Sequence, residues 1–263
     1  MLSKAYLPKA DKPPQGLPGQ WYPEHFNFSS SKPAPMQTVA EQAFFVPKLI
    51  SDKDCKQLIQ QMRNSGQAAP VGINGYMEGS DLQTGSIRAT GWSPELASEL
   101  WKLFQPYFSH IREMNDYTST DWYAFNERKE HRRWKAIGVS PLLRFMRYEA
   151  GGEHYGHYDM GFDYGDGRRT LVSFVVYLTD VPAGAGGATR LLIDGQEHLP
   201  VYERKLEDWE RRARETEVIG KVNPQKGGVF FFDHRICHDV ELYTGQPPRI
   251  IIRGDIVFYA LED

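Results

Sequence analysis

The pattern of apolar positions changes character near residue 118. Before this point, two segments repeat apolar residues at helical spacing. After it, apolar residues gather in short runs rich in aromatic and β-branched side chains, separated by glycine-containing turns, which is typical of strands. The pattern predicts a mainly β fold with flanking helices, in which an antiparallel sandwich or barrel carries helices on its outside.

The two helices have recognisable starting residues. Ser51 or Asp52 can cap the first, and Ser93 can cap the second, with Pro94 at its first position. Pro106 should bend or split the second helix, because proline lacks the backbone N–H that a helix interior needs. The apolar positions of the first helix are Cys55, Leu58, Ile59 and Met62; those of the second are Leu96, Leu100, Leu103, Phe104, Phe108 and Ile111.

Strands are expected from the aromatic and β-branched runs. Their predicted ranges are 122–125, 142–148, 171–178, 188–192, 228–232 and 249–259. The glycine-rich segment 72–85 is expected to be loop or irregular strand.

Two segments depart from this pattern. Residues 1–40 are rich in proline, which predicts an extended arm, and their aromatic residues indicate that part of the arm packs on the body. Residues 194–220 form an insert whose segment 202–215 is highly charged and favours a helix. This helix is either a solvated outer element or a lid over the active site.

Composition gives no support for a nucleic-acid-binding, membrane-spanning or disulfide-rich protein. The 263 residues suffice for a substantial core, and a net charge of −3 creates no strong field for nucleic acid or an anionic membrane. The N-terminus lacks a signal-peptide pattern, and no apolar run is long enough to span a membrane. Two cysteines give no disulfide framework, so a cytoplasmic protein is expected, with its oligomeric state left open.

The candidate chemistry centres on His157 and Asp159. Residues two apart on a strand point to the same face, so the two side chains can hold one metal ion together. His238 can supply a third ligand, which completes the two-histidine, one-carboxylate set of non-haem iron(II) sites. A His-x-acid triplet is expected about once by chance in this composition, so its surroundings must support it.

Those surroundings resemble a known family. Residues 145–159 (FMRYEAGGEHYGHYD) resemble the core signature of iron(II)/2-oxoglutarate-dependent dioxygenases of the prolyl 4-hydroxylase-like type, including the R-Y-x-x-G spacing before H-x-D. The match continues through residues 177–181, 186–189 and 222–232 to His238 and Gly245. It covers residues 142–259 and leaves 1–120 unmatched.

The resemblance implies a double-stranded β-helix, a jelly roll of the cupin-like kind. It implies iron(II) bound by His157, Asp159 and His238, with 2-oxoglutarate as cosubstrate, dioxygen as oxidant and ascorbate as a stimulant. We therefore expect a single catalytic domain over 41–263, with helical support over 41–120 and a jelly-roll core over 121–263.

The resemblance also implies residues that bind the cosubstrate. Tyr148 matches a tyrosine that contacts 2-oxoglutarate, although it could equally be a core aromatic residue. Arg249 follows the turn before the last strand, where the family has a cation for the distal carboxylate, one residue later than usual. Arg253 is the rival on the same strand face, about 13 Å further along, and we expect it instead to pair with an acid such as Asp255 or to line the pocket.

For the other polar candidates, a structural role is expected rather than a catalytic one. His154 is expected to face away from His157, and His234 is a secondary candidate ligand. Cys237 is expected to be a small buried residue of a strand, with a softer metal ligand as the alternative. Arg168 and Arg169 are expected in a solvated turn, with contact to an acidic substrate group as the alternative.

Three functions compete with hydroxylation. A non-catalytic jelly-roll binding protein and a cupin-like metal-dependent isomerase need no cation after the last turn, so the ligand set together with Arg249 disfavours both. A halogenase would replace the carboxylate ligand with a small residue, whereas Asp159 is present. The substrate stays open among a peptidyl proline, a free amino acid, a natural-product scaffold, a lipid and a sugar.

Overall fold

The computed structural model describes most of the chain. The described residues are 20–21, 23–24, 26–29, 34–65, 68–72, 83–110, 112–114, 132–159, 161–196, 199, 205 and 211–261. The predicted strand at 122–125 lies outside them, as does most of the predicted helix at 202–215 and most of the arm before residue 34.

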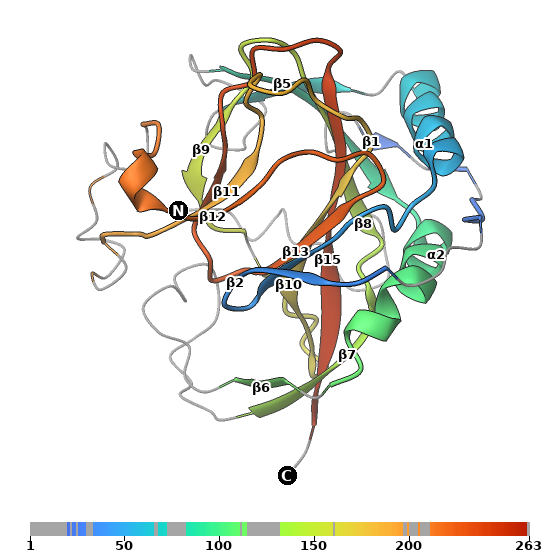
Figure 1. The fold of residues 1–263 in the computed structure, drawn as a ribbon. Coiled ribbons are helices and arrows are strands. Elements are labelled where there is room, and N and C mark those ends of the chain that lie inside the picture. Colours follow the sequence, from blue (N-terminus) through green and yellow to red (C-terminus); the bar gives the residue numbers. More distant parts are fainter. Residues whose placement is uncertain are drawn as a thin grey trace.

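Strands dominate the described residues (Figure 1). The helices are α1 (Asp52–Ser65), α2 (Pro94–Phe104) and the 3-10 turns η2 (Gln105–Tyr107) and η6 (Glu215–Glu217). The strands are β1 (Gln20–Trp21), β2 (Gln37–Ala40), β3 (Ala43–Val46), β4 (Ala69–Gly72), β5 (Gln83–Trp92), β6 (Arg112–Met114), β7 (Arg132–Val139), β8 (Leu142–Tyr148), β9 (His154–His157), β10 (Arg168–Tyr177), β11 (Thr189–Leu192), β12 (Val218–Val222), β13 (Val229–Asp233), β14 (His238–Val240) and β15 (Arg249–Leu261).

The strands form a large and a small sheet, as in a double-stranded β-helix. Within the described ranges, the large sheet follows the order β1-β5-β8-β15-β10-β13-β3-β2, with β4 beside β5, and with β7 beside β15 and β6. The small sheet has the order β12-β11-β14-β9. In Figure 1, α1 and α2 lie together on one side of the large sheet, away from β9 and β11.

Alternation along the strands divides the core in two. On β13, Phe231 packs with Phe104 of α2, with ring centroids 5.0 Å apart, so it belongs to the core between the large sheet and the helices. Phe230 and Phe232 point the other way and join Leu191 and Val240 of the small sheet. The second core lies between the sheets and includes Tyr148, which connects it to the candidate site.

The second helix is shorter than its apolar spacing predicts. Its start agrees, because the Ser93 side chain accepts a hydrogen bond from the Leu96 N–H at 3.0 Å. The α-helix ends at Phe104 and a single 3-10 turn follows, since Pro106 cannot donate to the preceding turn. Phe108 therefore lies outside the helix, although it still packs on Phe231 at 5.3 Å.

The sequence pattern also misses strand β5. Its residues from Ser86 to Trp92 pair in antiparallel register with β8. Small and polar side chains alternate along β5, so the strand has no apolar run from which it could be predicted. The strand therefore extends beyond the loop predicted for 72–85 and borders the interior of the fold.

The predicted arm and insert each include a short described strand. Residues 37–40 form β2, which pairs with β3, and β12 begins at Val218. Phe26 of the arm is buried and Phe28 packs against it, as expected for an arm that contacts the body. Among the described residues, no helix is long and apolar enough to cross a membrane.

Candidate metal centre

Strand pairing brings the three predicted ligands together. His157 ends β9 and His238 begins β14, and these two residues are direct partners in the antiparallel register. Their ring centroids lie 4.2 Å apart. Asp159 follows two residues after His157, and one potential ligand atom from each of the three residues lies within 4.8 Å of the others.

Backbone carbonyls orient both imidazoles. Nδ1 of His157 lies 2.7 Å from the Tyr155 oxygen, and Nδ1 of His238 lies 3.1 Å from the Ile236 oxygen. A carbonyl only accepts, so each Nδ1 carries the proton and each Nε2 keeps a lone pair for a metal. Burial lowers the pKa of His157 to about 3, with a further contribution from His238, and burial also lowers the pKa of His238. Both rings are therefore neutral near pH 7.

Asp159 is held as a carboxylate. Ser173 donates to its Oδ2 at 2.5 Å, and Nη2 of Arg253 lies 2.7 Å from its Oδ1. Burial alone would raise the pKa of Asp159, but the charge of Arg253 brings it well below its ordinary value. The cluster thus offers two neutral imidazoles and one anionic oxygen donor, a set suited to a divalent first-row transition metal.

Arg253 connects this carboxylate to a second acid, as expected from the sequence. Its Nη2 also lies 3.1 Å from Oδ1 of Asp255. His234 contacts the same Asp255 oxygen through Nε2 at 3.2 Å. His234, the secondary candidate ligand, is therefore engaged with Asp255 rather than grouped with the three ligands.

Arg249 has a very different environment. It is 1% exposed, and its guanidinium carbon lies 4.7 Å from the ring centroid of Tyr148 and 5.7 Å from that of Tyr177. Nη2 donates to Thr189 Oγ1 at 3.1 Å, whereas Nε and Nη1 have no hydrogen-bond partner among the described residues. A buried cation with two unsatisfied donors is costly unless a carboxylate accepts from it.

Comparison with known proteins identifies this part of the chain. Residues 143–255 match the model of the 2OG-Fe(II) oxygenase superfamily, and a comparison with curated proteins gives no match. This region is a 2OG-Fe(II) oxygenase domain. The matched residues include the three clustered ligands, Tyr148 and both arginines.

Several solved structures are similar to the chain. A viral collagen prolyl hydroxylase from Paramecium Bursaria Chlorella virus-1, in complex with 2OG, is 17% identical, with 83% of this chain and 96% of that chain covered and a TM-score of 0.44. A prolyl-4-hydroxylase from Pseudomonas putida is 14% identical over 82% and 92% of the two chains, with a TM-score of 0.47. The nogalamycin-biosynthesis epimerase SnoN is 14% identical over 83% and 76%, with a TM-score of 0.48.

The oxygenase domain fits both of its cofactors. The orientation of Nε2 on His157 and His238 and the ionised state of Asp159 suit iron(II). The unsatisfied donors of Arg249 suit a carboxylate of 2-oxoglutarate. The Tyr148 hydroxyl donates only weakly, to Sδ of Met146 at 3.8 Å, and lies near the Arg249 guanidinium, so it can donate more strongly to a ligand bound there.

His154 lies closer to the oxygenase centre than expected. Its ring centroid is 4.1 Å from that of His157, so the prediction that it faces the opposite side is wrong. The register between β9 and β14 shifts between His238 and Val240, which breaks the simple alternation of faces. Burial and the proximity of His157 lower the pKa of His154 to about 3.

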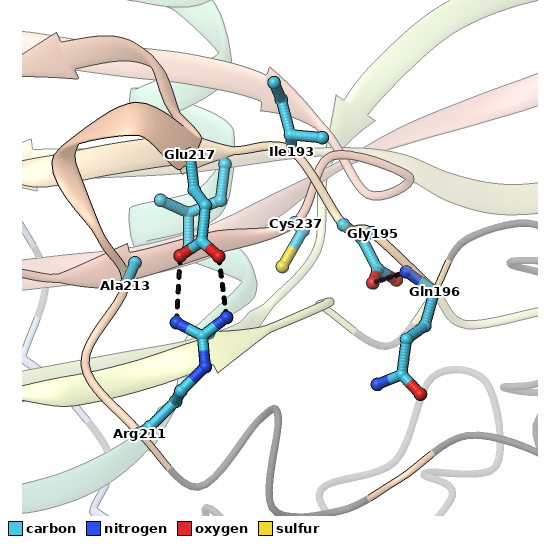
Figure 2. Close-up of a pocket in the computed structure, with 10 residues that line it drawn as sticks. Ile193, Gly195, Gln196, Arg211, Ala213, Glu217 and Cys237 are labelled. Atoms are coloured by element: carbon cyan, nitrogen blue, oxygen red, sulfur yellow. Dashed lines mark hydrogen bonds and ion pairs between the residues drawn. The ribbon is translucent and has the colours of Figure 1, made fainter.

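Leu192 of β11 and the residues that follow it border a cavity of about 240 Å³ (Figure 2). Gly156 and Cys237 line it, and each immediately precedes a ligand in the sequence. Arg211 and Glu217 form a double ion pair beside it. Cys237 is half-buried, is not part of a disulfide and precedes β14, which corrects its predicted place within a strand.

The other two predicted candidates occupy solvent-facing positions of the domain. Arg168 pairs with Asp166 at 2.7 Å, and Arg169 pairs with Asp163 at 2.7 Å. Both residues belong to β10, which corrects their predicted place in a turn, while their pairing with neighbouring acids agrees with the expected exposure to solvent.

Proposed function

We propose that this oxygenase hydroxylates an unactivated C–H bond of a small-molecule or peptidyl substrate, with release of succinate and carbon dioxide. The observation that carries the proposal is the combination of two sites in one interior. The His-Asp-His cluster lies on the side of the small sheet. The buried donors of Arg249 belong to β15, the final strand of the chain, which is in the large sheet.

Each residue receives a role in this proposal. His157, Asp159 and His238 bind iron(II), Arg249 binds the distal carboxylate of 2-oxoglutarate, and Tyr148 lies against that guanidinium. Iron(II) and 2-oxoglutarate, when bound, would supply the electrons that activate dioxygen, and dioxygen is the oxidant. The protein itself positions the ligands and keeps the surroundings dry, as the packing of Phe232 on His238 at 4.6 Å illustrates.

Arg253 is assigned to positioning rather than to the cosubstrate. Its contacts with Asp159 and Asp255 already satisfy its charge, and it restrains the carboxylate that we assign to iron. Neither a non-catalytic binding protein nor a cupin-like isomerase needs the second, buried cation Arg249. Its burial with unsatisfied donors therefore favours the oxygenase that consumes 2-oxoglutarate.

A cytoplasmic location belongs to the same proposal. Cys55 and Cys237 form no disulfide, which supports it, because cysteines stay reduced in that compartment.

The direct test is conversion of 2-oxoglutarate to succinate under air with iron(II) and ascorbate. We expect slow conversion by the protein alone, faster conversion with the true substrate, and none with His238→Ala. Absence of succinate from the parent protein across a broad substrate panel, or an equal yield from His238→Ala, would contradict the proposal.

A further inference from the structure

A second group of arginines faces the interior of the fold. Arg144 of β8 is the direct cross-strand partner of Arg253 on β15, and Arg88 of β5 is the partner of Met146 on β8. Directly paired residues share a face, and Met146 belongs to the core between the two sheets. Arg88 and Arg144 therefore point into the same interior as the metal centre.

Two acids of this interior that the structure describes, Asp159 and Asp255, are already engaged. Asp255 lies within 3.2 Å of both Arg253 and His234, and Arg144 reaches its other oxygen only at 3.4 Å. Asp159 is paired with Arg253 and assigned to iron. Among the described residues, the side chain of Arg144 has one hydrogen-bond partner, Asp255, and that bond is long. The Arg144 guanidinium therefore retains N–H donors for an incoming anion.

The pKa of Arg144 also reflects the concentration of positive charge around it. Burial, followed by the charge of Arg253, lowers the pKa of Arg144 to about 10, and Arg88 adds to the effect. Arg144 thus remains charged near pH 7 while it is repelled by its neighbours. An added anion would relieve this repulsion, and the side chain of Arg144 is 24% exposed, so an anion can reach it.

The group lies beside the metal and apart from the cosubstrate cation. Arg144 is linked through Asp255 and Arg253 to the ligand Asp159. Arg249 lies four residues before Arg253 on β15, about 13 Å away along the strand. One cation and the metal suffice to bind 2-oxoglutarate, which leaves Arg144 without a role in cosubstrate binding.

We propose that the substrate is a small molecule with a free carboxylate, and that Arg144, with Arg88 beside it, binds this carboxylate next to the metal. A planar guanidinium can donate two parallel hydrogen bonds to a carboxylate, which fixes the orientation of the substrate as well as its position. A residue within a peptide has no charged carboxylate on its backbone, so the arginines favour a free acid over a peptidyl substrate. This inference rests on the proposed function.

The test compares acids with their primary amides, using free amino acids and amino-acid amides as the first panel. The parent protein should release succinate faster with at least one acid, and the matching amide should have no effect. Arg144→Gln should raise both the KM and the anaerobic Kd of that acid about tenfold to a hundredfold, with unchanged affinity for 2-oxoglutarate. Arg144→Lys, which keeps the charge, should recover part of the loss.

Arg147→Gln is the matched control. Arg147 lies on the same strand but points to the other face, where its Nη2 pairs with Glu149 at 2.6 Å. It should leave the KM and Kd of the acid unchanged. If Arg144→Gln fails to fold, as judged by circular dichroism and iron binding, the acid and amide comparison on the parent protein still decides.

Three outcomes would overturn the inference: stimulation by amides or peptides as strong as by acids, a panel in which no acid stimulates, or an unchanged KM and Kd in Arg144→Gln. Slow succinate release by the parent protein without substrate tests the proposed function separately. If this release is seen while one of the three outcomes occurs, the oxygenase function stands and only the assignment of Arg144 to a substrate carboxylate is wrong.

Discussion

Arg249 and Arg253 illustrate how two identical residues of one strand can serve different purposes. Arg253 lies within 3.1 Å of two carboxylates, Asp159 and Asp255, and so acts as a fixed counter-ion. Arg249 contacts aromatic rings and one hydroxyl, and its remaining donors are unsatisfied within the described structure. The first environment stabilises a metal ligand, whereas the second is prepared for a carboxylate that the protein itself does not provide.

Substitution of each arginine should separate these purposes. Arg249→Ala should weaken 2-oxoglutarate binding by at least about tenfold with iron retained, because a charge-assisted hydrogen bond contributes roughly 1.5–3 kcal/mol. Arg253→Ala should affect 2-oxoglutarate much less and iron more, since it releases Asp159. Equilibrium titration of each ligand measures both effects, and the reverse order for 2-oxoglutarate would transfer the role to Arg253.

At the scale of elements, the sequence predicts best where one face of a strand or helix is apolar. The predicted strand 142–148 coincides with β8, and the predicted start of α2 at Ser93 is confirmed by its hydrogen bond. Strand β5 was missed because Ser86, Arg88 and Thr90 face a polar interior, so its pattern lacks an apolar stripe.

The site shows the same limit. The spacing of His157 and Asp159 is visible in the sequence, but their union with His238 depends on the pairing of β9 with β14. The approach of His154 to His157 follows from a register shift that no local pattern reveals. The arginine group around Arg144 likewise arises from three strands that are distant in the chain.

At the scale of the whole molecule, the buried histidines make stability depend on pH. His154 and His157 have a pKa of about 3 in the folded protein, against an ordinary value of 6.5. Between these values the unfolded chain binds protons that the folded protein excludes, so stability must rise with pH across this window.

We therefore expect the metal-free protein to have a lower free energy of unfolding at pH 5 than at pH 7. Urea denaturation at the two pH values measures the difference, and His154→Gln should reduce it because one excluded proton is removed. A stability that is equal at both pH values, or higher at pH 5, would show that these imidazoles are not held neutral by burial.

The central claim is that one iron(II) ion binds to His157, Asp159 and His238 on the side of the small sheet. Anaerobic iron titration of the purified protein tests it most directly, with alanine at each of the three positions. We predict about one iron per chain for the parent protein and loss of that site in each variant, as a facial triad requires. Three variants that all bind iron like the parent would contradict the account.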